Sequence, residues 1–302
     1  EKMTVTEKQQ AILQGVVLKD SSLPETETEF NDQELSYTVT EGRGCRLEDG
    51  KITVTEEGAK LKLSFEGLEE SETYLITEGL DYEALSPREL VSDKKWEKMT
   101  QYEKNQVLEE DSRWRYWKES QEASIKVSGA FSEKKIKIFT DKYNAYSGKH
   151  NFLCNAGYSQ KPIHTITLTF ENTGVYSYDS LKVVCQPVEN IGRQTRNLAK
   201  NVLSDIETEA NVLRGTITLS KPKALVISLP YSEGFTAYVD GEEAELKQAN
   251  TMYMALELPE GEHEIELIYR TPWLKEGGFL TFLGALCYIG VVRKNKKRIR
   301  KI

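Results

Sequence analysis

The sequence predicts a mainly β protein: two tandem β-sandwich-like domains with a helical insertion and a connecting helix, followed by one C-terminal transmembrane helix. Three observations support this fold class. Short segments that alternate apolar and polar residues recur along the chain between turn residues, as in antiparallel sheets. Apolar residues at helix-like intervals interrupt these segments. An uncharged stretch, residues 277–292, lies near the end of the chain and precedes a run of basic residues.

The charge of the chain is distributed unevenly. The chain has 40 Lys+Arg and 48 Asp+Glu, a net charge of −8. Residues 277–302 contain seven basic and no acidic side chains, which leaves 33 basic against 48 acidic side chains, or −15, in residues 1–276. A nucleic-acid-binding protein needs a basic face to displace counterions, so this acidic body excludes nucleic acid as a partner.

The uncharged stretch is typical of a membrane helix. Counted from Trp273, residues 273–292 would form a helix of roughly 30 Å, which matches the hydrocarbon core of a bilayer. The basic run that follows predicts a cytoplasmic tail at 293–302, with residues 1–272 outside the cell membrane. The alternative is a buried core helix that happens to precede a basic tail. The residues expected at the two membrane interfaces are Trp273, Arg293, Lys294, Lys296 and Lys297.

Residues 1–34 are predicted to form an N-terminal helix and a connector. Ile12, Leu13, Val16 and Val17 have near-helical spacing, and a polar acidic stretch follows from about residue 20.

Residues 35–187 are predicted to form a β-sandwich, jelly-roll-like in character. The alternating segments are residues 60–65, 124–131, 135–139, 164–170 and 180–187, with a hairpin turn expected at 132–134. Residues 82–123 are highly charged, contain three tryptophans and show no alternation. We therefore expect them to be an insertion that is helical in part.

Residues 188–272 are predicted to form a helix, over 188–206, and a small second β-sandwich. Its strand-like segments are residues 215–220, 224–229, 235–239, 252–258 and 263–269. Asp240-Gly241 and Glu260-Gly261 mark tight turns between them.

Motifs for common catalytic chemistry are absent from the sequence. It lacks the GxSxG, HExxH, Walker A and GxGxxG patterns, and no pair of carboxylates stands out for acid–base work, so no catalytic residue is assigned. His263 shares strand parity with two apolar residues and is expected to pack inward or to form a local hydrogen bond. Asp240 is expected to occupy its hairpin turn because Asp tolerates the backbone geometry of such turns.

The four cysteines also lack the spacing of a zinc site, so neither a metal nor a cofactor is expected. Cys154 and Cys185 could form a disulfide outside the cell, but free buried thiols are the simpler interpretation. The remaining two are Cys45 and Cys287.

The candidate ligand site is the cluster Trp114, Arg115, Tyr116 and Trp117. Aromatic rings bind the C–H faces of sugars, and a charged neighbour can hold hydroxyl or phosphate groups. The alternative, which we favour, is that these aromatic side chains anchor the insertion onto the sandwich.

The last hundred residues contain an ordered series of short motifs that ends in the terminal helix: Pro230-Tyr231, Gly234-Phe235, Val239-Asp240-Gly241, Gly261-Glu262-His263 and the Tyr-Arg-Thr-Pro of 269–272. This pattern resembles the YfhO family of bacterial membrane proteins, which are polytopic and grouped with GT-C glycosyltransferases. At the position of Phe235 the family often has Trp.

This resemblance implies a transferase that modifies a cell-envelope polymer, such as lipoteichoic acid, with a polyprenyl-phosphate-linked sugar. Its catalytic acids would lie in an early extracytoplasmic loop that this chain does not contain. The chain would then be an accessory or binding region, and its expected partners are the lipid bilayer, the remaining transmembrane part of the same protein, and a glycopolymer or polyprenyl-phosphate sugar.

Two other function classes stay open. The chain could be a carbohydrate-binding single-pass surface protein, which requires a signal peptide upstream of Glu1. It could also be a self-contained exterior hydrolase, but the sequence shows no catalytic constellation for that.

Overall fold

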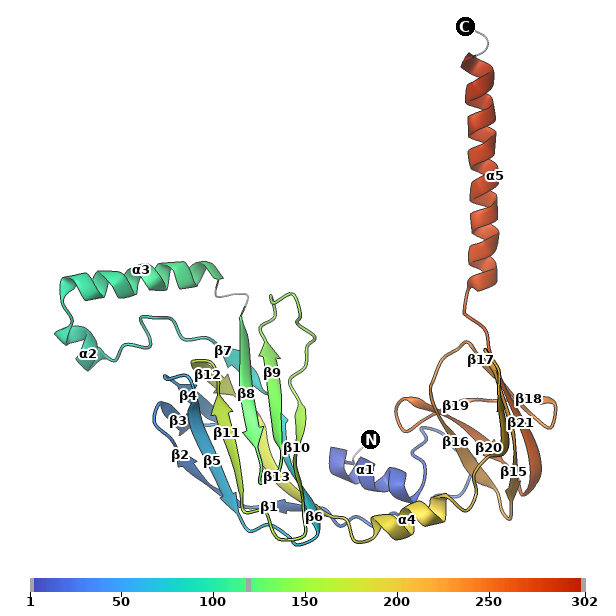
Figure 1. Ribbon diagram of the computed structural model, residues 1–302, viewed down its shortest axis with the longest axis horizontal. Helices are drawn as coiled ribbons and strands as arrows, with labels where there is room; N and C mark the ends of the chain where they lie inside the picture. Colours follow the sequence, from blue (N-terminus) through green and yellow to red (C-terminus); the bar gives the residue numbers. More distant parts are fainter. Residues whose placement is uncertain (1–2, 118–120, 300–302) are drawn as a thin grey trace. The chain divides into compact units, whose positions relative to one another are not determined.

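The structure, a computed structural model, describes residues 3–117 and 121–299, and the side chains of 117 and 294–299 are not described. The chain is mainly β, which confirms the predicted fold class (Figure 1). It divides into two compact units, Phe30–Ile191 and a second unit formed by Glu1–Glu29 together with Gly192–Ile302.

The first unit contains three antiparallel sheets. One sheet has the order β1 (Gln33–Leu35), β13 (Ser180–Pro187), β6 (Ser71–Glu78), β10 (Phe152–Ser159). A second has the order β2 (Tyr37–Glu41), β5 (Ala59–Phe65), β11 (Thr165–Phe170), β8 (Glu122–Ser128), β9 (Glu133–Phe139). The third has the order β3 (Cys45–Glu48), β4 (Lys51–Val54), β12 (Gly174–Ser177), β7 (Asp81–Glu83).

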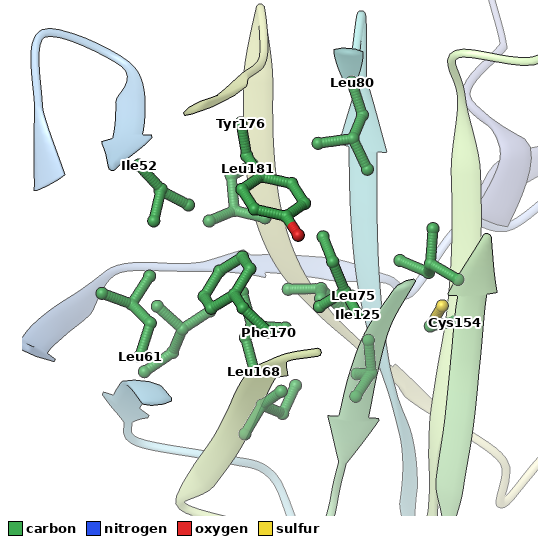
Figure 2. Close-up of a cluster of buried hydrophobic side chains, with 14 of the residues drawn as sticks. Ile52, Leu61, Leu75, Leu80, Ile125, Cys154, Leu168, Phe170, Tyr176 and Leu181 are labelled. Atoms are coloured by element: carbon green, nitrogen blue, oxygen red, sulfur yellow. The ribbon is translucent and has the colours of Figure 1, made fainter. Parts of the chain in front are cut away.

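The alternating strands of this unit enclose its main hydrophobic core. In β5, Leu61 and Leu63 are fully buried while the alternating Lys60 and Lys62 face solvent. Figure 2 shows side chains from all three sheets converging on Phe170 and Tyr176, whose ring centroids are 4.8 Å apart. Burial of these apolar side chains supplies the main driving force for the unit, at roughly 25 cal/mol per Å² removed from water.

The insertion between β7 and β8 contains two helices, α2 (Asp93–Lys98) and α3 (Gln101–Trp117). The hairpin that follows differs from the prediction, because its turn lies at 129–132 and not at 132–134. Gly129 explains the shift: its N–H donates to the Ser132 carbonyl at 2.9 Å, and a Cβ at this position would lie 2.0 Å from the Ala156 carbonyl oxygen. Only glycine permits such a close approach of two backbones.

The second unit packs two antiparallel sheets around a smaller core. One has the order β14 (Ser204–Thr208), β15 (Val212–Leu219), β21 (Gly261–Tyr269), β17 (Phe235–Val239), β18 (Glu242–Ala244). The other has the order β16 (Lys223–Pro230), β20 (Tyr253–Leu258), β19 (Lys247–Ala249). Asp240 and Gly241 form the β17–β18 hairpin turn with φ of 53° and 84°, as a two-residue primed turn requires. The turn at Glu260-Gly261 instead connects strands of different sheets.

The helix predicted over 188–206 is shorter than expected. Helix α4 covers Ile191–Leu198, and residues 204–208 form strand β14, which pairs with β15. Val202 and Ile206, two of the apolar residues that suggested a longer helix, are exposed. Pairing along the edge of β15, together with the packing of Leu203 on the core, outweighs the weak helical pattern of this polar segment.

Residues 1–29 belong to the second compact unit, although the whole first unit, Phe30–Ile191, separates them from the rest of it in sequence. Helix α1 (Val5–Gln14) begins with a capping box between Thr4 and Glu7. After the helix, the Val17 N–H donates to the Asn250 side chain at 2.9 Å, and Leu18 forms a β-bridge with Ala249. The N-terminal segment thus extends the sheet that contains β19.

The cysteines are free thiols, and Cys154 and Cys185 are buried. Cys154 pairs with Leu75 on one side of β6, and Cys185 pairs with Thr73 on the other. Two strands of separation amount to about 10 Å, which is beyond the reach of a disulfide. The simpler of the two interpretations of these cysteines is therefore confirmed.

Candidate functional site

The second unit joins its C-terminal helix through a tightly packed junction. The Phe235 and Tyr269 ring centroids are 4.9 Å apart, and the Arg270 N–H donates to the Gly234 carbonyl at 2.8 Å. A Cβ at Gly234 would lie 2.6 Å from the Arg270 carbonyl oxygen and 3.2 Å from Pro272. The Gly-aromatic step and the Tyr-x-x-Pro exit therefore fix the path of the chain as it leaves the last strand.

Helix α5 (Leu274–Ile299) follows this junction directly. Its segment Leu274–Arg293 is long and apolar enough to cross a membrane, and none of that stretch is buried inside the protein. A core helix would be covered by its neighbours, so this exposure favours a lipid environment. Trp273 lies just before the helix and is 78% exposed, and Arg293 lies at the other end of the segment. The side chains of Lys294, Lys296 and Lys297 lie outside the described residues.

His263 and Asp240 form a local pair within the second unit. His263 is 7% exposed, and its Nδ1 lies 2.7 Å from Asp240 Oδ2 while its Nε2 lies 3.2 Å from the Pro259 carbonyl oxygen. The hydrogen bond from His263, followed by one from the Glu264 N–H, lowers the pKa of the Asp240 carboxyl. Both ring nitrogens are engaged in local contacts, which confirms the expected structural role. The sequence did not predict that the Asp240 side chain would form hydrogen bonds with His263 and with the Glu264 N–H, both outside its own turn.

Within the insertion, Asp111 links α3 to the segment that precedes α2, and sequence reasoning did not single it out. Asp111 is 3% exposed and accepts hydrogen bonds from the Arg88 N–H at 3.3 Å and from Arg115 Nε at 2.8 Å. Burial acts to raise the pKa of Asp111, but hydrogen bonds from Ser86, Arg88 and Arg115 lower it overall. Nearby, the Arg88 guanidinium lies 4.1 Å from the centroid of the Trp96 ring.

The predicted sugar-binding cluster lies in the last turn of α3. Successive residues of a helix point about 100° apart, and Trp114 is half-buried while Tyr116 is 78% exposed. Arg115 is paired with Asp111, and the Trp117 side chain lies outside the described residues. Sugar binding by these four side chains stays a prediction.

A pocket of about 300 Å³ lies beside β9 and the loop that follows it. We call it the lysine–aromatic pocket, and its lining is Lys135, Ile136, Lys137, Phe139, Tyr146, Ser147, Lys149 and Phe152. Sequence reasoning missed it because lysines on an alternating strand are typical of an ordinary solvated face. The signal that could have revealed it is the excess of lysine in this part of an otherwise acidic chain.

Comparison with known proteins identifies the family. The chain matches the family described as "Bacterial membrane protein YfhO" over residues 1–281, which is most of its length. The chain belongs to the YfhO family. The resemblance carried by the last hundred residues is thereby confirmed and extends to the first unit.

Within the YfhO family, one curated relative is the uncharacterized protein YfhO of Bacillus subtilis (strain 168), which is 23% identical over 175 residues. The match covers 55% of this chain and 20% of the relative, so the chain spans about a fifth of that protein's length. Among solved structures, a mutant of the arabinofuranosyltransferase AftD from Mycobacteria aligns with 11% identity and a TM-score of 0.20, covering 51% of this chain and 13% of that one.

Across the parts of this YfhO-family chain that the structure describes, no group of three His, Cys, Asp or Glu side chains could hold a metal ion. The buried cysteines are poor nucleophiles, since burial raises the pKa of the Cys45 thiol to about 11 and also raises that of Cys154. What the chain offers is a membrane helix, a rigid junction and exposed side chains on β units.

Proposed function

We propose that this chain is the extracytoplasmic end of a polytopic membrane glycosyltransferase, in which residues 1–272 lie outside the membrane and residues 293–302 lie in the cytoplasm. The observation that carries the proposal is the membership of the bacterial YfhO membrane-protein family together with an apolar helix that directly follows the last strand of the second unit. The basic residues after the helix support this orientation.

In this proposal the parent protein transfers a sugar from a polyprenyl-phosphate carrier to a cell-envelope polymer such as lipoteichoic acid. The catalytic acids lie in the remaining transmembrane part, and the two β units hold the acceptor polymer near that active site. An accessory role agrees with the chemistry of the described residues, which offer exposed aromatic and charged side chains rather than an activated nucleophile.

Deletion of the gene in the source bacterium tests the proposal. We expect the sugar content of the envelope polymer to fall, and complementation with the full-length gene to restore it, as measured by nuclear magnetic resonance of purified lipoteichoic acid. A full-length gene that lacks the codons for residues 30–191 should restore membrane insertion but not full glycosylation. Unchanged glycosylation in the deletion strain, for each envelope polymer analysed, would refute the transferase function.

A further inference from the structure

The lysine–aromatic pocket lies on the outer face of an edge strand. Ile136 and Ile138 of β9 point into the core, so the alternation of the strand places Lys135, Lys137 and Phe139 on the opposite face. β9 pairs with β8 on one side and ends its sheet on the other. Lysine on an edge strand also opposes aggregation, so these lysines alone do not indicate a binding site. The loop folded beside these lysines distinguishes a binding site from a protected edge.

That loop, residues 140–151, is held in place by specific contacts. The Tyr143 ring stacks on Phe139 with centroids 5.0 Å apart, and Tyr143 is also hydrogen-bonded to Glu122, which raises the pKa of its hydroxyl. The Tyr146 hydroxyl lies 3.2 Å from His150 Nε2, and His150 Nδ1 lies 3.1 Å from the Leu80 carbonyl oxygen. A loop that is already ordered loses little conformational entropy when a ligand binds.

The charge of the pocket is opposite to that of the body. Residues 133–152 contain five lysines and two acidic residues, a net charge of +3, whereas residues 1–276 together carry −15. Lys135 is neutralised by Glu171, so Lys137 and Lys149 supply the available positive charge. Lys149 Nζ lies 4.8 Å from the Phe152 ring centroid, an interaction that does not neutralise its charge. Among the described residues, no acidic side chain lines the pocket.

This combination selects a particular class of ligand. The two lysines attract phosphate groups, while Phe139 and the partly exposed ring of Tyr146 offer apolar faces to the C–H groups of a sugar ring. The volume of about 300 Å³ suits one sugar–phosphate unit. A polymer would continue along the exposed edge of β9.

We propose that the lysine–aromatic pocket binds one repeat of a phosphate-bearing glycan polymer, with Lys137 and Lys149 on the phosphate and Phe139 and Tyr146 on the sugar. The inference deepens the proposed function, on which it rests for the identity of the acceptor, because it names the surface that holds the polymer.

The test measures binding of the full 302-residue chain, placed in nanodiscs of neutral lipid, to deacylated lipoteichoic acid. We expect binding that weakens as salt rises, because released counterions accompany each phosphate contact. The K137Q/K149Q double variant should bind at least about tenfold more weakly, a loss typical of two charge-assisted contacts. The matched control is K60Q/K62Q, which removes two exposed lysines from β5 of the same sheet and should bind within about twofold of the wild type.

Three outcomes would overturn the inference: a K137Q/K149Q variant that binds as well as the wild type, a neutral dextran that binds as tightly as the polymer, or vesicles of phosphatidylglycerol that compete more strongly than the polymer. The last result would assign the pocket to lipid headgroups. Binding and transfer can fail separately. Normal glycosylation in the deletion strain refutes the proposed function without affecting this binding, whereas loss of glycosylation combined with unaltered binding by K137Q/K149Q refutes the pocket alone.

Discussion

At the scale of single residues, the second unit depends on polar side chains that connect segments distant in sequence. Glu257 of β20 accepts hydrogen bonds from the Ser21 and Ser22 hydroxyls at 2.6 Å each and pairs with Lys247 Nζ at 3.0 Å. Its carboxylate therefore holds the N-terminal segment against the β16–β20–β19 sheet. Hydrogen bonds to a charged group of this kind contribute about 1.5–3 kcal/mol each when they are removed singly.

The environment of Glu257 leads us to predict that the second unit loses stability in acid. The hydrogen bonds from Ser21 and Ser22 lower the pKa of Glu257 to about 2, below its unfolded value. A lowered folded-state pKa gives stability that is fully present above about pH 4.3, the unfolded value, and is lost as the pH falls through the folded value. We expect Glu257→Gln to lower the unfolding free energy of this unit by about 1–3 kcal/mol at neutral pH.

Urea unfolding at neutral and acid pH measures this difference. The gap between wild type and Glu257→Gln should shrink as the pH falls toward 2, because the wild-type carboxyl then becomes protonated. The control is Glu262→Gln, an exposed glutamate of the same unit. A gap that is constant across this pH range would contradict the role assigned to the Glu257 charge.

Gly234 makes a second prediction at this scale. A methyl group there meets the Arg270 carbonyl oxygen and the Tyr269 ring at 2.6 Å, and backbone cannot move away cheaply. Gly234→Ala should destabilise the second unit by about 1–3 kcal/mol through overpacking. Gly192→Ala is the control, because its nearest neighbour is the flexible end of Arg196 at 3.5 Å. Equal thermal stability of the two variants would show that the junction is not tightly packed.

At the scale of elements, the strands were predictable and their boundaries less so. Strict alternation at Leu61 and Leu63, and again at Ile265 and Leu267, gave the strands and their inward faces, because a period of two fixes the buried face. The helix over 188–206 was overextended because Val202 and Ile206 happen to fit a helical interval although neither is buried. No local sequence pattern reveals that the edge of β15 is available for pairing with residues 204–208.

Local sequence patterns alone were also insufficient to define the candidate sites. Adjacency in sequence predicts the cluster at 114–117, but successive residues of a helix point about 100° apart, so adjacency alone does not place these side chains on one face. The lysine–aromatic pocket gathers residues from a strand and a loop that only the folded chain brings together. Asp111 was equally hidden, since one acidic residue in a highly charged segment carries no signal until its burial is known.

The insertion provides the prediction at this scale. Asp111→Ala removes the carboxylate that accepts the Arg88 N–H and the Arg115 side chain, leaving the part-buried Arg88 N–H without its partner. We expect faster hydrogen exchange across residues 86–115, corresponding to a local loss of about 1–3 kcal/mol, and little change in the sheets. Glu109→Ala, which removes an exposed pair with Arg113, should change exchange by less than about 0.5 kcal/mol. Equal effects of the two variants would contradict the role of Asp111 in holding the insertion together.

At the scale of the whole molecule, the chain combines an acidic body, one apolar helix and a basic end. Residues 1–276 carry −15 and residues 277–302 carry +7, and all the basic side chains of the latter lie at positions 293–301, after the apolar part of the Leu274–Arg293 segment. This order is the one that the proposed function requires, with an exterior region joined to a last membrane helix. The YfhO family membership is consistent with such a layout, and the match to about a fifth of the Bacillus subtilis relative agrees with a longer parent protein.

The most direct test of this account is an immunoblot of protoplasts from the source bacterium, with antiserum against residues 1–272, before and after external protease. We predict a membrane-bound band far above the mass of a 302-residue chain, and its loss when protease is added to intact protoplasts. A band that survives until the protoplasts are lysed would place residues 1–272 in the cytoplasm and contradict the account. A protease-sensitive band at the mass of 302 residues would contradict the polytopic parent and favour a single-pass surface protein.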